Sequence, residues 1–521
     1  MKQFLMTIIA LAASLVAAAQ PSWASRALTD LHRAMTIADS TVERFFDGEK
    51  TLSMYYVFDT KQKQDVASVW EYTSAFEAMN SILEALNEVK TIAPDLYAAK
   101  YNHYLQLMQK FYNGLEQYNA AAAITSYTRT QNWSVYCVHR GANPANSNYH
   151  EAVYDDQMWI TRELLRAYKL TGDAKFLTRA EYLAQYVMDG WDCTLDKNGN
   201  EYGGITWGYG YTSKHACSNG PIVAPLAWLA DEYQGSSLSL RYFIIQPDGS
   251  RVKGPLNRHD FYLESAKKVY QYHKDAFYDK QSGVFHDMRG GVTGELRFDT
   301  IQGRRYRAHV DVGNPGGTKF TYNTGTELSG AAELYRITGE QKYLDDMQHI
   351  SEAAYSYFTH YVKTDSGYAR QWPANNSKDY DNMPWFNDVL LRGLLDVYNY
   401  SPSVSKSIEL FNDNLDYAWT HYRREGMLPD ALVEGWGSVK KMMVQTPFAL
   451  ASDYAMLVKY RLRADNPNAA SNVVSLKLNK GKRSGVYDMQ GRVVCRRNEG
   501  GQSIAGLQHG VYVVDGKKII H

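Results

Sequence analysis

The sequence feature that most constrains the fold is an internal repeat of a helical hairpin. Residues 165–177 read LRAYKLTGDAKFL and residues 334–344 read LYRITGEQKYL, so both copies hold a helical segment, a glycine and a second helical segment. Gly172 and Gly339 suit the left-handed backbone that ends a helix, and Asp173 can cap the helix that follows. Because a lone hairpin cannot bury its apolar stripe, such units must pack side by side.

Helical periodicity extends over most of the chain, from Ser25 to Arg463. The chain has 521 residues, of which 45% are hydrophobic, so it can bury a large core. We predict an all-α fold in which residues 25–463 form one domain, a toroid of helical hairpins. An open helical solenoid is the alternative.

Two adjacent carboxylates, Asp155 and Asp156, stand directly before a predicted helix over residues 158–170. Neighbouring side chains on a helix fan about 100° apart, so the two carboxyl groups can lie roughly 5 to 6 Å from each other, as a retaining glycosidase requires. The structural alternative is that one Asp caps the helix and the helix dipole favours the other. Tyr154 and Gln157 flank the pair and are candidate substrate-binding residues.

A glycine-rich segment interrupts the helices at residues 201–211. Trp207, Tyr209 and Tyr211 stand at every second position, so in a β-hairpin they would share one face. A row of rings can stack on the apolar faces of sugars, or it can simply cover the core. We include Trp207 and Tyr209 among the candidate substrate-binding residues.

Two further polar segments precede helical runs. Ser218 and Asn219 can act as ordinary helix caps, or Asn219 can present its amide to a substrate hydroxyl. Tyr322 and Asn323 precede the second copy of the repeat much as residues 154–157 precede the first. We therefore expect these polar segments to line the same end of the toroid.

The chain begins with a predicted signal peptide, residues 1–24. Lys2 supplies a positive charge, residues 4–16 form an apolar run, and Ala17–Ala19 offer small residues for cleavage. The run is shorter than the ~20 residues of a membrane helix, and no comparable run follows. We expect an exported protein with no integral membrane segment.

The end of the chain has a different pattern. A polar linker over residues 464–470 is followed by short strands and glycine turns over residues 471–521, which predicts a small β domain. The change from helical to strand pattern indicates a separately folding unit.

Composition excludes several functions. The 56 Lys and Arg balance 56 Asp and Glu without a basic run, so there is no electrostatic footprint for nucleic acid.

Only His150 lies near the Asp pair, so we expect no metal site and no cofactor. The four cysteines lack zinc-site spacing, although one disulfide can form in an exported protein: Cys137, Cys193, Cys217 and Cys495.

Seven pieces of the sequence, taken in order, resemble glycoside hydrolase family 76, the α-1,6-mannanase family. No single piece is specific, but the ordered set is. The pieces are Trp70–Tyr72, Tyr154–Gln157, Leu165–Leu177, Gly203–Trp207, Ser218–Pro221, Thr321–Asn323 and Phe386–Leu395.

This resemblance implies an (α/α)6 barrel and a retaining mechanism on α-mannosidic bonds. It puts Asp155 on the nucleophile and Asp156 on the general acid/base. The adjacency makes chemical sense, because two carboxylates this close cannot easily both ionise and their pKa values separate. Residues 235–255 look like an insertion relative to the family pattern, at one edge of the cleft.

We therefore expect a monomeric, exported hydrolase that cleaves α-1,6-mannan, its polysaccharide substrate, by endo-action. A transglycosylase on the same barrel is one alternative. A non-catalytic glycan-binding protein is another, and the adjacent acid pair argues against it.

The tail resembles the C-terminal sorting domain of Bacteroidetes proteins that the type IX secretion machinery exports. That resemblance implies a secreted or cell-surface protein. If the tail is instead a glycan-binding or spacer module, a periplasmic location is expected.

Overall fold

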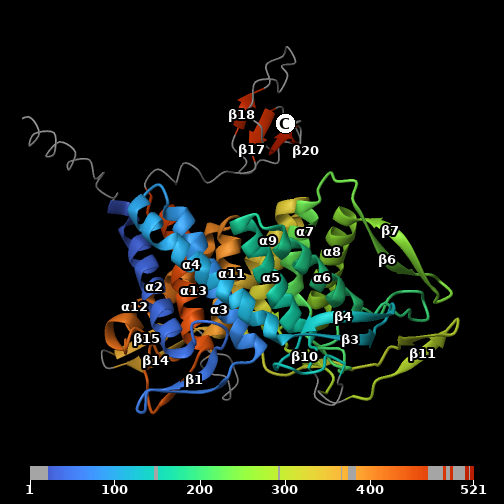
Figure 1. Ribbon diagram of the computed structural model, residues 1–521, viewed down its shortest axis with the longest axis horizontal. Helices are drawn as coiled ribbons and strands as arrows, with labels where there is room; N and C mark the ends of the chain where they lie inside the picture. The colour runs from blue at the N-terminus through green and yellow to red at the C-terminus, as the bar shows by residue number, and fades with distance from the viewer. Residues whose placement is uncertain are drawn as a thin grey trace, which may run out of the picture.

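The structure is a computed structural model that describes residues 22–145, 151–291, 294–364, 367–372 and 383–466, and four short strands between residues 485 and 520. Within these residues twelve α-helices alternate between an inner and an outer ring. Figure 1 shows these helices from the side. The inner helices are α3 (Val69–Val89), α5 (Tyr154–Thr171), α7 (Gly220–Glu232), α9 (Thr321–Thr338), α11 (Pro384–Tyr398) and α13 (Gln445–Ala464). The outer helices are α2 (Ser25–Phe45), α4 (Pro94–Leu115), α6 (Ala174–Asp189), α8 (Arg258–Phe277), α10 (Gln341–Phe358) and α12 (Ser405–His421).

The inner helices form a closed ring. Each packs against the next inner helix, and α13 packs back against α3. Each of the outer helices α4 to α12 packs on the inner helix that precedes it in the chain, and α2 packs on α13. The chain therefore folds as an (α/α)6 barrel, and the predicted all-α toroid is confirmed.

The two copies of the repeat are the hairpins α5–α6 and α9–α10. Gly172 follows α5 with φ 71° and Gly339 follows α9 with φ 69°, so both have the predicted left-handed backbone. Asp173 Oδ1 accepts a hydrogen bond of 3.0 Å from the backbone N–H of Lys175, which caps α6. The apolar stripe of α6 is buried at Phe176, Ala180, Leu183, Ala184 and Val187.

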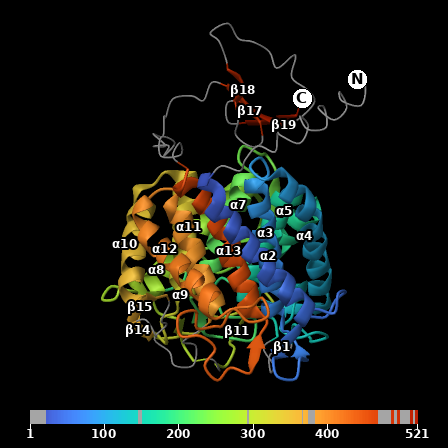
Figure 2. The ribbon, with the colours of Figure 1, turned by 90° about the vertical axis from the view of Figure 1, so that its left-hand side faces the viewer.

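Most strands of the barrel domain form short hairpins. In both views β1, β11, β14 and β15 lie at its lower end, and Figure 1 shows β10 there as well (Figure 1, Figure 2). The strands are β1 (Ser53–Val57), β2 (Gln62–Val66), β3 (Asn119–Thr125), β4 (Thr130–Tyr136), β5 (Lys214–His215), β6 (Ser239–Ile245), β7 (Arg251–Asn257), β8 (Tyr278–Asp279), β9 (Val284–Phe285), β10 (Met288–Arg289), β11 (Phe298–Ile301), β12 (Arg304–Arg307), β13 (Pro315–Gly316), β14 (His360–Thr364), β15 (Gly367–Gln371) and β16 (Lys441–Met443). The helical pattern did not predict them. Residues 120–123 are all alanine, yet they lie in β3 because its seven residues pair in register with β4.

The predicted β-hairpin over residues 201–211 is wrong. This segment forms only isolated bridges to neighbouring segments, such as the one between Gly208 and Val153. Gly203 and Gly204 have φ values of 76° and 81°, which break the two-residue period of a strand. The three rings after them therefore do not share one face.

The C-terminal strands form one antiparallel sheet in the order β18-β17-β19-β20. Their bounds are β17 (Gly485–Asp488), β18 (Val493–Arg496), β19 (Val511–Val514) and β20 (Lys517–Ile520), in agreement with the predicted small β domain. Most of the predicted signal peptide and linker lies outside the described residues. Among the described residues, no helix is both long and apolar enough to cross a bilayer.

Candidate active site

A cavity of about 660 Å³ opens where the inner helices begin. Its walls come from the first turns of α3, α5, α9 and α11 and from the loops before α7 and α9. The two polar segments that precede the repeats thus meet at one end of the barrel, as predicted. The lining residues include Ser68, Trp70, Asp155, Asp156, Trp159, Trp207, Tyr211, His215, Cys217, Asp287, Phe320, Tyr322, Trp385 and Phe386.

Asp155 and Asp156 lie inside the first turn of α5, which begins one residue earlier than the pair. The backbone N–H of Tyr154 donates a hydrogen bond of 2.8 Å to the Trp207 carbonyl, which fixes the start of the helix. The Tyr154 ring is fully buried against the Tyr186 ring, with centroids 4.8 Å apart. Tyr154 therefore anchors the pair from behind and does not line the cavity.

Three donors converge on the Asp155 carboxylate. Its Oδ1 accepts from the backbone N–H of Asp156 at 2.9 Å, and its Oδ2 accepts from Trp207 Nε1 at 3.0 Å. The Cys217 thiol is a third donor. Burial raises the pKa of Asp155, and these hydrogen bonds oppose that rise by stabilising the ionised form.

Asp156 has the opposite surroundings. It is 9% exposed, and its carboxyl group has no hydrogen-bond donor among the described residues. Burial, followed by the charges of Asp155, Glu71 and Glu151, raises the pKa of Asp156 well above its ordinary value. At neutral pH this asymmetry favours an ionised Asp155 beside a protonated Asp156.

Trp207 lies between the acid pair and His215. Its ring stacks on the His215 ring with centroids 4.5 Å apart, and the Tyr211 ring is also 4.5 Å away. Burial lowers the pKa of His215 to about 4, so this imidazole is neutral beside the acids. Trp207 and Tyr211 line the cavity, whereas Tyr209 packs against the main core.

Further aromatic rings complete the cavity wall. Trp159 and Trp385 meet edge to face at 4.8 Å, and Tyr322 meets Phe386 at 4.5 Å. Trp70 stacks over Phe386 at 6.1 Å. The wall therefore offers several flat apolar faces around two carboxyl groups.

Three predicted substrate-binding residues lie behind the cavity. Gln157, Ser218 and Asn219 are fully buried, and none lines the cavity. Gln157 binds the backbone of Tyr136 through both its amide atoms, at 3.0 and 2.7 Å. Asn219 does the same for Ile205, at 2.8 and 3.0 Å, so these side chains hold the segments that surround the site.

The structure adds an acid that the sequence analysis missed. Asp287, 8% exposed, lines the cavity and accepts hydrogen bonds from Tyr322 Oη at 2.7 Å and Asn323 Nδ2 at 3.3 Å. Tyr322 lines the cavity, whereas Asn323 is fully buried behind it. Asp287 stands alone between two short strands, so no spacing pattern marks it.

No group of three or more His, Cys, Asp or Glu residues in the described part of the chain could hold a metal ion. Cys137, Cys193 and Cys217 are buried free thiols. The side chain of Cys495 lies outside the described residues.

The chain matches the sequence model of one protein family. A sequence model of glycosyl hydrolase family 76 matches residues 30–237 and 256–428, and the gap at 238–255 falls within the predicted insertion. No curated protein matches the chain.

Solved structures share the fold. The family 76 mannosidase Bt3792 from Bacteroides thetaiotaomicron VPI-5482 is 22% identical, with a TM-score of 0.58 over 82% of this chain and 98% of that chain. The α-1,6-mannanase GH76A from Salegentibacter sp. HEL1_6 is 19% identical, with a TM-score of 0.52 over 82% and 98%. Because the family model matches well over half of the sequence, this chain belongs to glycosyl hydrolase family 76 and is a glycoside hydrolase.

Proposed function

We propose that this protein is an exported, retaining hydrolase that cleaves α-1,6-mannosidic bonds of mannan. The observation that carries the proposal is the asymmetry of the acid pair. Three donors hold the Asp155 carboxylate, while Asp156 has no donor among the described residues and faces the same cavity. Asp155 is thus stabilised as an anion, and Asp156 keeps a proton that it can donate.

In the proposed first step, Asp155 attacks the anomeric carbon while Asp156 gives its proton to the leaving glycosidic oxygen. A glycosyl–Asp155 ester forms and the first product leaves. Asp156, now ionised, takes a proton from water as that water attacks the anomeric carbon, and Asp155 is released. Two displacements at one carbon return the original configuration.

A related enzyme supports both the acid pair and the substrate. A variant of the Salegentibacter mannanase with two consecutive aspartates changed to asparagine is described as inactive, and it was solved in complex with α-1,6-mannotriose. The aromatic wall here, from Trp70 to Phe386, suits consecutive sugar rings. For that reason we propose endo-action on a mannan chain.

Export is also part of the proposal. The signal peptide and the strand-rich tail are sequence features, and the type IX sorting role rests on the resemblance of the tail. The location we propose is the cell surface or the medium.

The test is incubation of the mature protein with unbranched α-1,6-mannan. Chromatography should show a ladder of oligosaccharides, and proton NMR during the first minutes should show the α-anomer forming first. Early β-anomer would contradict retention, and a failure to shorten the chain would contradict the substrate. Products longer than an oligosaccharide substrate would favour the transglycosylase.

A further inference from the structure

The hairpin β6–β7 is an addition to the family pattern, and it is firmly attached. Its strands pair in register from Ser239 with Asn257 to Ile245 with Arg251, and residues 238–255 are those that the family model skips. From β6, Tyr242 Oη donates a hydrogen bond of 3.1 Å to the buried Asp189. Asn257 Oδ1 caps α8 directly after the hairpin by accepting from the Asp260 backbone at 3.2 Å.

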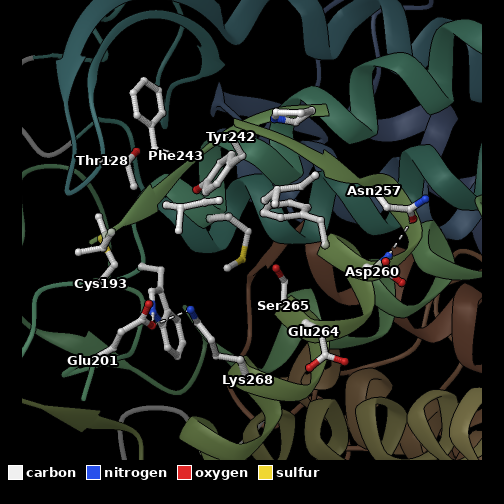
Figure 3. A pocket seen from close by; sticks show the side chains of 17 residues that line it. Thr128, Cys193, Glu201, Tyr242, Phe243, Asn257, Asp260, Glu264, Ser265 and Lys268 are labelled. Atoms are coloured by element: carbon white, nitrogen blue, oxygen red, sulfur yellow. Dashed lines mark hydrogen bonds and ion pairs between the residues drawn. The ribbon is translucent and has the colours of Figure 1, made fainter. Parts of the chain in front are cut away.

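A second cavity of about 490 Å³ lies between this hairpin and α8 (Figure 3). It shares no lining residue with the catalytic cavity. Because β6 and β7 supply part of its wall, the family pattern alone does not build it. Its lining residues include Thr128, Met188, Trp191, Cys193, Glu201, Tyr242, Leu256, Asp260, Phe261, Glu264, Ser265 and Lys268.

Part of the wall of this second cavity is aromatic and apolar. The Tyr242 and Phe261 rings lie 4.7 Å apart, and Trp191 adds a third ring. In Figure 3, Tyr242 lies across the cavity from Ser265 and Lys268 of α8. Rings with this placement offer flat faces to the C–H groups of a ligand.

Polar groups of α8 line the same cavity, and two of them, Ser265 and Asp260, have free hydrogen-bonding capacity. Asp260, Glu264 and Lys268 repeat at four-residue spacing along α8, with Ser265 beside them. The Ser265 residue is 7% exposed, and its hydroxyl has no hydrogen-bond partner among the described residues. The Asp260 carboxylate likewise accepts no hydrogen bond from them.

The charged groups of the cavity wall exclude some classes of ligand. The walls hold three carboxylates and one ammonium group, which disfavours an anion. A cationic ligand is disfavoured because Lys268 already occupies the most favourable position for a cation. Its Nζ lies 2.6 Å from Glu201 and 4.8 Å from the centre of the Trp191 ring. A purely apolar ligand would cover the buried Ser265 hydroxyl without giving it a hydrogen-bond partner. A neutral ring with hydroxyl groups matches both the aromatic and the polar groups of the wall.

We propose that this cavity is a second, non-catalytic carbohydrate site that binds a neutral hexopyranose unit. The sugar class follows from the walls described above. Its identity as a mannosyl unit of the polymer rests on the proposed function. Bound there, a mannan chain stays near the enzyme between cleavages, so the site should matter for long chains and not for short ones.

The test uses Ser265→Leu, which fills the cavity, and Ser265→Ala, which removes only the hydroxyl. Val252→Ser is the matched control, because Val252 is 50% exposed on the same hairpin and does not line the cavity. Melting temperatures establish that each variant is folded. If Ser265→Leu fails to fold, the binding affinity of Ser265→Ala decides whether the second site exists.

Binding is measured by calorimetry in the Asp155→Asn, Asp156→Asn background, with methyl α-mannoside and α-1,6-mannotetraose as probes. We expect two sites in the parent and in Val252→Ser, and one in Ser265→Leu. Ser265→Ala should weaken the second site about five- to tenfold, as for one lost hydrogen bond. In the active enzyme, Ser265→Leu should raise KM for long mannan by a similar factor and leave turnover of mannotetraose unchanged.

A single binding site in the parent, or equal binding by Ser265→Leu and Val252→Ser, would overturn the second site. The two proposals can fail separately. If the enzyme cleaves mannan but Ser265→Leu changes nothing, only this inference fails. If mannan is not cleaved but Ser265→Leu abolishes binding of methyl α-mannoside, the sugar site stands and the proposed function fails.

Discussion

Two pairs of buried aspartates lie in the same barrel, and they differ in what surrounds them. Asp155 and Asp156 begin α5, while Asp388 and Asp453 belong to α11 and α13. Burial raises the pKa of all four, and in each pair the charge of one member raises the pKa of its neighbour further. By pKa alone the two pairs are alike.

Access and hydrogen bonding separate them. Asp388 is fully buried and accepts a hydrogen bond of 2.9 Å from Arg392, which also binds Glu77. Asp155 and Asp156 face a cavity of about 660 Å³, and the three donors to Asp155 stabilise its ionised form and not that of Asp156. The comparison teaches that a raised pKa identifies a catalytic acid only where a substrate can reach it.

The largest expected effect comes from the pair that faces the cavity, Asp155 and Asp156. Asp155→Asn and Asp156→Asn should each lower kcat on mannan about a thousandfold or more while the protein stays folded, because the change is nearly isosteric. With α-mannosyl fluoride, whose leaving group needs little acid, Asp156→Asn should still form the glycosyl-enzyme and Asp155→Asn should not. Mass spectrometry of the trapped ester checks this, and the reverse result would exchange the two roles.

The donors to Asp155 provide a finer test. Trp207→Phe keeps a ring but removes the N–H group that stabilises the carboxylate, so the pKa of Asp155 should rise further. The acidic limb of the kcat/KM profile should then move to higher pH, with activity near pH 5 falling about tenfold. Cys217→Ser, which retains a donor, is the control.

Trp207→Ala should in addition weaken binding of mannan oligosaccharides by about 1–2 kcal/mol through loss of the ring. If Trp207→Phe leaves the pH profile in place, its hydrogen bond to Asp155 does not tune the acid.

A substitution in the second pair, Asp388 and Asp453, should change stability and not turnover. Asp388→Asn should leave kcat within about twofold of the parent. Because folding raises the pKa of Asp388 above 3.8, the native state holds its proton more tightly, and the parent loses stability as pH rises above about 4. The variant lacks this loss, so its unfolding free energy relative to the parent should increase with pH. Urea unfolding at several pH values measures it, and a large loss of kcat would break the comparison.

The smallest effect is expected from the tail. Cutting the chain near Asn468 should leave a soluble barrel with full activity on mannan, because α13 ends at Ala464 and all cavity residues precede the cut. In the native host the same cut should retain the enzyme in the periplasm. An inactive or insoluble product would mean that the tail packs on the barrel, and an active enzyme still at the cell surface would refute the sorting role.

The sequence alone was enough to predict the barrel and to predict which segments meet at one end of it. Gly172 and Gly339 end helices in any context, because few other residues adopt positive φ easily, so the repeat reports the fold directly. The segments Tyr154–Gln157 and Thr321–Asn323 were expected at one end because they hold equivalent places in the repeat. Local chemistry determined both features.

The sequence misled for residues whose place depends on contacts with segments distant along the chain. Gln157, Ser218 and Asn219 were predicted to bind substrate, but their polar groups satisfy the backbone of neighbouring segments. From sequence alone, a buried polar side chain that serves the backbone cannot be told from one that serves a ligand. Asp287 was missed because only the fold brings it to Tyr322.

The closure of the ring has a kinetic consequence. The first helix, α2, packs on the last, α13, and Arg26 donates a hydrogen bond to Asp465, 439 residues along the chain. No N-terminal fragment that lacks α13 can therefore complete the barrel, and the faces of α2 and α3 that pack on α13 stay uncovered until that helix is present. Contacts between such distant segments form slowly. Until that closure, apolar surface stays exposed, and a partly folded chain of this kind is prone to aggregate.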